Sequence, residues 1–121
     1  MMARTMFDRY GGFSKISKIV LSLYDKVIDS PITKPYFQNT NMKRLIDHQT
    51  QFISSLMGGP ASYTNEHLER THVHLKINEE AFNEIIYLLT ETLEDHGFND
   101  ADIADVQNEF LKRKNHIIQK A

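Results

Sequence analysis

Hydrophobic side chains in the first third of the chain recur with the period of an amphipathic α-helix. Their positions fall at i, i+3, i+4, i+7, i+8 and i+11, which predicts one apolar stripe on a helix of period 3.6. The stripe consists of Ile16, Ile19, Val20, Leu23, Tyr24 and Val27. Gly11-Gly12 precedes it and Ser30-Pro31 follows it, and both pairs are typical of helix breaks. We therefore expect a helix between these two breaks.

A second stripe contains one polar residue. The segment from Asn39 to Asn41 offers N-cap side chains, and the helix predicted after it continues to Gly58-Gly59-Pro60, because proline cannot continue a helix. The face that we expect to be buried consists of Leu45, Gln49, Phe52, Ile53 and Leu56. Gln49 thus places an amide inside an otherwise apolar face.

Two more helical stripes lie in the second half of the chain. The first stops at Gly97, a residue type favoured just after a helix C-terminus. Its apolar residues are Phe82, Ile85, Ile86, Leu89 and Leu93. Asn99 or Asp100 can cap the last predicted helix. That helix carries Ile103, Val106, Phe110, Ile117 and Ile118.

Residues 60–78 have a weaker pattern, which we interpret as a loop and a short helix from Glu66 to His74. No segment alternates with period two between hairpin turns, and no repeat of about 20 to 50 residues is visible. The predicted fold class is all-α, with four substantial helices and several short ones.

Composition and charge exclude several classes of protein. A chain of 121 residues is about one domain's worth, so we expect residues 1–121 to form a single domain. A net charge of −2 makes nucleic acid an unexpected partner, and no apolar run approaches the roughly 18 residues that span a membrane. The first residues lack the apolar core of a secretion signal, so we expect a cytoplasmic protein. Because the chain has no cysteine, any metal must be held by histidine or carboxylate.

One histidine stands out by its position. The sequence contains no HExxH motif, no glycine-rich phosphate loop and no strained nucleophile turn. Most histidines in a small protein are surface or hydrogen-bonded core residues. His72, however, is flanked by Leu68, Leu75 and Ile77, so its imidazole can face an apolar cavity. A neutral imidazole nitrogen is a normal axial ligand of haem iron.

Polar groups also fall on the apolar faces of the first two long helices. Gln49 is either a core amide bonded to a neighbouring helix or a donor to a ligand, since burying it unpaired costs about 1 to 3 kcal/mol. The Tyr24 hydroxyl likewise needs a partner if it is buried. His48 lies about 100° around the helix from Gln49, as a boundary residue or as one that points inward.

Several short motifs follow one another in a specific order along nearly the whole chain. They are Phe7-Asp8-Arg9-Tyr10-Gly11-Gly12, Leu23-Tyr24, Tyr36-Phe37, Asn41-Met42, His48-Gln49 with Phe52, Gly58-Gly59-Pro60, Tyr63, His72 with Leu75 and Ile77, and Phe82. In this order and spacing the chain resembles the group I truncated haemoglobins, the small globins with a two-over-two helical sandwich around haem. The sandwich fold and the cofactor, haem b, are what the resemblance implies.

The resemblance also implies roles for individual residues. His72 matches the proximal histidine, Phe37 the ring that wedges against the porphyrin, and Tyr24 and Gln49 the distal hydrogen-bonding pair. Leu45 takes the place of the globin distal histidine. The residues expected to contact the haem are Phe37, Met42, Leu45, His48, Phe52, Ile53, Leu68, His72, Leu75, Ile77, Phe82 and Ile86, with Val106 as an additional neighbour.

The chain departs from the family pattern at two positions. His48 stands where many members carry Lys or Arg toward a haem propionate, and Asn65 stands where glycine is usual. His48 either coordinates the iron as a sixth ligand or binds a propionate at the haem edge. His74 cannot face the iron together with His72. For His116, the resemblance leaves open a covalent link to a haem vinyl group.

The implied function is binding of dioxygen, nitric oxide or carbon monoxide, for carriage, sensing or nitric oxide dioxygenation, the last of which needs an external reductase. An alternative is a six-coordinate haem protein for electron transfer or for redox chemistry of peroxide or nitrogen oxides. A third possibility is a helical interaction module whose histidines bind nothing. We expect a monomer with no nucleic acid or membrane partner.

Overall fold

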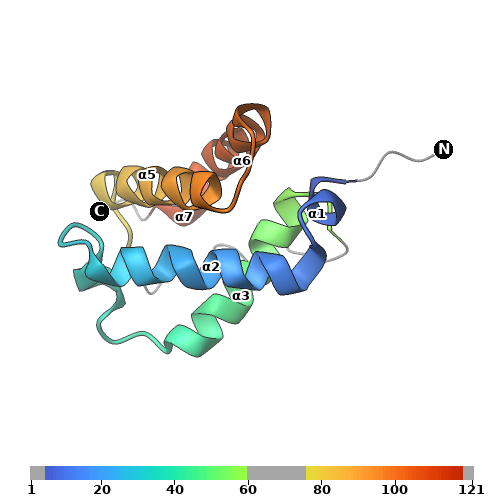
Figure 1. The fold of residues 1–121 in the computed structure, drawn as a ribbon. Coiled ribbons are helices and arrows are strands. Elements are labelled where there is room, and N and C mark those ends of the chain that lie inside the picture. Colours follow the sequence, from blue (N-terminus) through green and yellow to red (C-terminus); the bar gives the residue numbers. More distant parts are fainter. Residues whose placement is uncertain (1–4, 60–75, 119–121) are drawn as a thin grey trace.

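The computed structural model describes residues 5–59 and 76–118, and every regular element in these two segments is a helix (Figure 1). The elements are α1 (Met6–Arg9), α2 (Gly12–Asp29), the 3₁₀ helix η1 (Lys34–Phe37), α3 (Met42–Leu56), α5 (Glu79–Asp95), α6 (Asp100–Lys112) and α7 (Lys114–Ile117). The predicted all-α class is confirmed. None of the described helices is long and apolar enough to cross a lipid bilayer.

The helices form two crossed pairs. Helix α2 packs against both α3 and α5, and α5 packs against α6. In Figure 1, α2 and α3 cross in the lower part of the molecule, and α5 and α6 lie above them. The rings of Phe52 and Phe110 meet edge to face, with centroids 5.2 Å apart, and so join α3 to α6. The core therefore lies between the two pairs.

Asparagine side chains begin three of the long helices. The side-chain oxygens of Asn41, Asn78 and Asn99 each accept a hydrogen bond from a backbone N–H in the first turn, at the start of α3, α5 and α6. Such caps satisfy donors that a helix leaves unpaired at its N-terminus. Asn99, and not Asp100, is thus the cap of α6.

The last predicted helix is two helices, because the chain turns at Arg113. The Arg113 guanidinium donates to the backbone oxygen and the carboxylate of Glu109, at 2.9 and 2.7 Å. Its backbone N–H bonds to the Phe110 oxygen, three residues back, instead of continuing the α-helical ladder. These bonds satisfy carbonyl groups at the end of α6. The apolar period continues past this break, so the sequence pattern did not indicate where α6 ends.

Gly59 allows the end of α3 to lie close to α1. A Cβ atom at this position would lie 2.7 Å from a ring carbon of Phe7 and 2.9 Å from the Ser54 backbone oxygen. The Phe7 N–H also donates to the Met57 oxygen, at 2.9 Å. A side chain at residue 59 would therefore push these two helices apart.

A buried carboxylate joins the first helical segment to α6. Both terminal nitrogens of Arg9 donate to Asp102 at 2.9 Å, and the Tyr10 hydroxyl donates to it at 2.6 Å. The Tyr10 ring stacks on Phe98, with centroids 3.6 Å apart. Hydrogen bonds, first from Arg9 and then from Tyr10, lower the pKa of Asp102 below its usual 3.8. The charged form of Asp102 therefore stabilises the folded chain.

We expect acid to weaken this link. The pKa of Asp102 is lower in the folded than in the unfolded chain, so the unfolded chain binds more protons, and the stabilisation is lost as pH falls from about 4 through the folded pKa. Asp102→Asn should lower the thermal midpoint at pH 7 and make its decline below pH 5 shallower. The control is Asp105→Asn, which changes an exposed carboxylate on the same helix. Equal pH dependence in both variants, measured by circular dichroism, would contradict the prediction.

Candidate functional site

The turn between α2 and η1 brings two aromatic rings together. Tyr24, on α2, and Phe37, at the end of η1, are 6% and 4% exposed, and their rings meet edge to face with centroids 5.8 Å apart. Thr33 is fully buried, and its hydroxyl donates to the Val27 backbone oxygen at 2.6 Å. The Lys34 N–H bonds back to the Ser30 oxygen at 2.8 Å. These bonds fix the turn and so hold Phe37 against Tyr24.

Thr33 is the positioning residue that the sequence analysis missed. Because threonine carries a hydroxyl, it is not counted among the apolar positions from which buried faces are predicted. The available signal was the Ser30-Pro31 break, which requires local side-chain hydrogen bonds to stabilise the turn after it.

One face of α3 combines apolar residues with a buried amide. Leu45, Gln49 and Phe52 lie at i, i+4 and i+7 and are 5%, 2% and 1% exposed. The Asn41 cap fixes where the helix begins and therefore which residues share this face. His48 is half-buried beside Gln49, as its place on the helix requires. The face thus carries an amide within it and an imidazole next to it.

The segment leading into α5 supplies further buried apolar residues. Ile77 and Phe82 are each 1% exposed, on the two sides of the Asn78 cap. Ile86, one turn after Phe82, is half-buried. The Lys114 ammonium group of α7 lies 5.9 Å from the centroid of the Phe82 ring, which ties α7 to the start of α5.

The residues expected at the haem fall into three groups. Those that are buried are Phe37, Leu45, Phe52, Ile53, Ile77 and Phe82, with Val106 also buried. Those that are half-buried are Met42, His48 and Ile86. Those that lie outside the described residues are Leu68, His72 and Leu75, together with His74. The structure therefore describes the expected haem contacts on η1, α3 and α5 and leaves out those next to His72. His116 is half-buried on α7.

The buried side chains of this region fit a large flat cofactor such as haem. In residues 5–59 and 76–118 no group of three or more His, Asp or Glu side chains could hold a metal ion. A haem brings four of its own nitrogens and needs only one or two axial ligands from the protein. Aromatic and aliphatic side chains with a few polar tips, as on α2, η1 and α3, fit such a large flat group.

Comparison with known proteins gives a consistent family. Residues 5–119 match the family model of the bacterial-like globins. The chain is 32% identical over 101 residues to the group 1 truncated hemoglobin of Tetrahymena thermophila, covering 84% of each chain.

Solved structures share the fold. A tyrosine-to-phenylalanine mutant of the truncated hemoglobin of Tetrahymena pyriformis, in its Fe(III) form, superposes with a TM-score of 0.85 at 26% identity, over 97% of this chain and 100% of the other. The cyanomet 2/2 hemoglobin of Synechococcus with covalently attached heme gives a TM-score of 0.86 at 20% identity, over the same shares. The second match bears on the fold alone. From the helical pairs, the apolar faces with their polar tips and these matches, the chain belongs to the bacterial-like globin family as a group 1 truncated haemoglobin, a haem-binding globin.

Proposed function

We propose that the protein binds dioxygen reversibly at haem b, with His72 as the proximal ligand and Tyr24 and Gln49 as hydrogen-bond donors to the bound molecule. The observation that supports this function is the burial of a phenol and an amide on the apolar faces of two helices that pack together, α2 and α3. In such surroundings a hydrogen bond to a polarised ligand is stronger than in water. When bound, the haem supplies the iron at which a diatomic ligand sits.

The apolar residues have a separate role in this proposal. Phe37 and Phe52 present flat rings, Leu45 takes the position that a distal histidine fills in other globins, and Ile77 and Phe82 close the side toward α5. Their burial keeps water away from the ligand. Met42 and Ile86, being half-buried, contact the edges of the haem, and Leu68 and Leu75 flank His72.

The test is absorption spectroscopy of the protein reconstituted with haemin. We expect a Soret band distinct from that of free haemin, a ferrous form that gives a stable and reversible oxygen complex, and a carbon monoxide complex. A spectrum that stays that of free haemin would overturn the proposal.

The half-buried position of His48 beside Gln49 favours one refinement. We propose that its imidazole competes for the sixth iron position, so that oxygen binds only the fraction of molecules in which His48 is released. The apparent oxygen affinity falls by that same fraction. A site closed in this way also suits the second candidate function, electron transfer or redox chemistry of nitrogen oxides or peroxide, with a reductase as partner.

His48→Leu tests this refinement. The unliganded ferrous form should change from sharp, split visible bands to one broad band, and carbon monoxide should bind faster, because no side chain has to leave the iron first. The control is His96→Leu, since His96 is a half-buried histidine bonded to Ser22 at 3.2 Å. If His48→Leu changes neither the spectrum nor the rate, His48 binds a propionate or solvent instead.

The covalent link from His116 to a haem vinyl stays a prediction. Acid extraction into an organic solvent removes haem that is held without a covalent bond. Haem that stays with the wild-type chain but is extracted from His116→Ala would support the link.

A further inference from the structure

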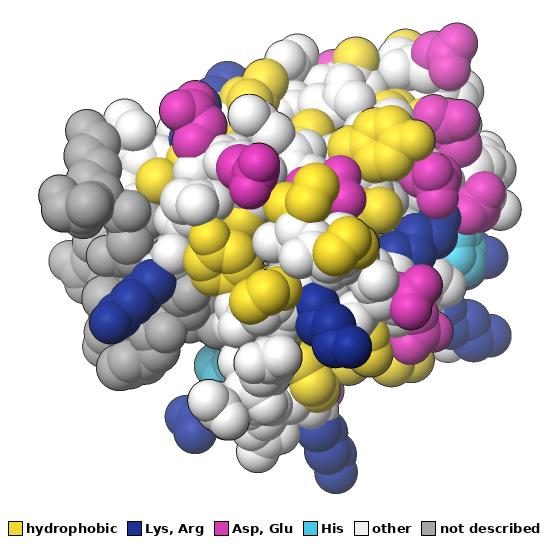
Figure 2. Space-filling view, turned by 90° about the vertical axis from the view of Figure 1, so that its left-hand side faces the viewer, with side chains coloured by type: hydrophobic (Ala, Val, Ile, Leu, Met, Phe, Trp, Pro, Cys, Tyr) yellow, Lys and Arg dark blue, Asp and Glu magenta, His cyan; other side chains and the backbone are white. Residues whose placement is uncertain are grey.

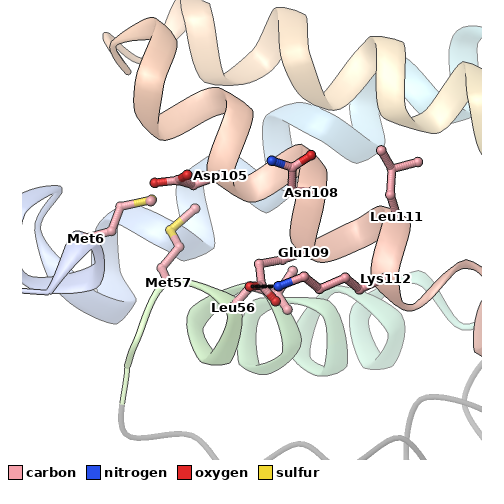
Figure 3. A pocket seen from close by; sticks show the side chains of 8 residues that line it. All are labelled: Met6, Leu56, Met57, Asp105, Asn108, Glu109, Leu111 and Lys112. Atoms are coloured by element: carbon pink, nitrogen blue, oxygen red, sulfur yellow. Dashed lines mark hydrogen bonds and ion pairs between the residues drawn. The ribbon is translucent and has the colours of Figure 1, made fainter.

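A hollow lies between α1, the end of α3 and α6 (Figure 3). It is an open groove of about 680 Å³, and none of its lining residues belongs to the proposed haem site. The lining residues are Met6, Leu56, Met57, Asp105, Asn108, Glu109, Leu111 and Lys112. We call it the α6 groove.

The α6 groove has an apolar side and a polar side. Met6, on α1, and Leu56, at the end of α3, are half-buried, and Leu111 is 51% exposed. Met57 also lines the groove but is only 2% exposed. Methionine side chains are flexible and polarisable, so they adapt to differently shaped partners. Such a surface suits binding of an apolar side chain that a partner inserts.

The polar side presents one carboxylate that is available to a partner. Glu109 is already neutralised, by Lys112 at 3.3 Å and Arg113 at 2.7 Å. Asp105 is exposed and makes no ion pair within the described part of the chain. In Figure 3 the Asp105 side chain lies beside those of Met6 and Met57. A ligand that carries a cation next to an apolar group would therefore find both a carboxylate and an apolar surface here.

The sequence segment that carries Asp105 is rich in carboxylates. Residues 77–111 contain no Lys or Arg, and all fourteen such residues of the chain lie outside this segment. Its carboxylates are Glu79, Glu80, Glu84, Glu91, Glu94, Asp95, Asp100, Asp102, Asp105 and Glu109. Figure 2 shows the same separation on another side of the molecule, with carboxylates mostly in the upper part and Lys and Arg mostly in the lower part. Five of these ten carboxylates are held in ion pairs, namely Glu79, Glu91, Asp95, Asp102 and Glu109. Asp105 is therefore the carboxylate that the α6 groove offers to a cation.

We propose that the α6 groove docks a basic amphipathic segment of a partner protein, with an apolar side chain between Met6, Met57 and Leu111 and a Lys or Arg on Asp105. The groove is open to the surface and not enclosed, which suits a peptide segment. Grooves that take an amphipathic helix recognise it through apolar anchors in this way.

The probe is a fluorescein-labelled helical peptide of leucine and lysine, about four turns long, and the protein is the haem-loaded ferrous carbon monoxide form. Anisotropy gives the affinity. In the same complex, ¹³C-labelled methionine methyl groups are followed by NMR. The resonances of Met6 and Met57 should shift on binding, and that of Met42, which lies at the start of α3 and outside the groove, should stay in place.

Matched variants distinguish binding in the α6 groove from non-specific electrostatic attraction of the peptide to the protein. Asp105→Lys and Leu111→Ser should each weaken binding at least about fivefold, the effect of roughly 1 kcal/mol. Glu94→Lys makes the same charge change on α5, and Leu21→Ser removes an equally exposed leucine from α2, so both should leave the affinity within about twofold.

Three outcomes would overturn the proposal. Equal weakening by the groove and control variants would show non-specific attraction. Shifts of Met6 and Met57 that depend on protein concentration without peptide would assign the groove to a second copy of the chain. Unchanged resonances of Met6 and Met57 at saturating peptide would place the bound peptide elsewhere on the protein.

Discussion

Replacing His72 with alanine is expected to remove the proximal iron ligand and most of the haem affinity. Loss of a group that only supports a metal ligand costs about 10- to 100-fold in affinity, so loss of the ligand itself should cost at least about 100-fold. We expect faster transfer of haem to an acceptor apoprotein and a Soret band typical of weakly ligated haem. Added imidazole should restore the histidine-ligated spectrum, because it replaces the missing nitrogen without the side chain.

The neighbouring histidine provides the control for this experiment. His74 lies two residues from His72, so His74→Ala removes the same group from the same segment of the sequence. We expect it to keep the wild-type spectrum and haem affinity. If His74→Ala loses haem and His72→Ala does not, the proximal ligand has been assigned to the wrong histidine.

Removing the distal donors should have the second largest effect. Tyr24→Phe keeps the ring and therefore its edge-to-face contact with Phe37, but it loses the hydroxyl. Gln49→Leu keeps the size and loses the amide. Each change should speed oxygen dissociation about tenfold, the factor that corresponds to about 1.4 kcal/mol for one hydrogen bond to a polarised ligand.

Two features make this measurement specific. Stopped-flow dissociation is followed in a His48→Leu background, so that competition by His48 does not mask the effect. Carbon monoxide polarises less than dioxygen when bound, so its dissociation should change much less. The double variant gives the coupling between the two donors. If oxygen dissociates at the wild-type rate from both single variants, neither side chain donates to the ligand.

The two distal donors also illustrate how far sequence reasoning extends. The helical period placed Tyr24 and Gln49 on apolar stripes, and the structure finds both side chains buried. Both findings follow from local geometry, since residues three and four positions apart share a helix face. The function of these side chains depends on what lies opposite them, which the period cannot indicate. Their roles therefore rest on the family resemblance and remain proposals.

Local signals in the sequence predicted the four long helices and most of the residues on their buried faces, since stripes, asparagine caps and glycine or proline breaks act within a few residues. The end of α6 is set locally, by bonds from Arg113 to Glu109 four residues earlier, but the apolar period continues across it and does not indicate it. Packing of the helices brings together groups that are far apart in the sequence: Arg9 with Asp102, 93 positions later, Phe7 with Gly59, and Met6 with α6 around one groove. Contacts between distant residues depend on how the helices pack, and the spacing of residues along the sequence does not indicate that packing.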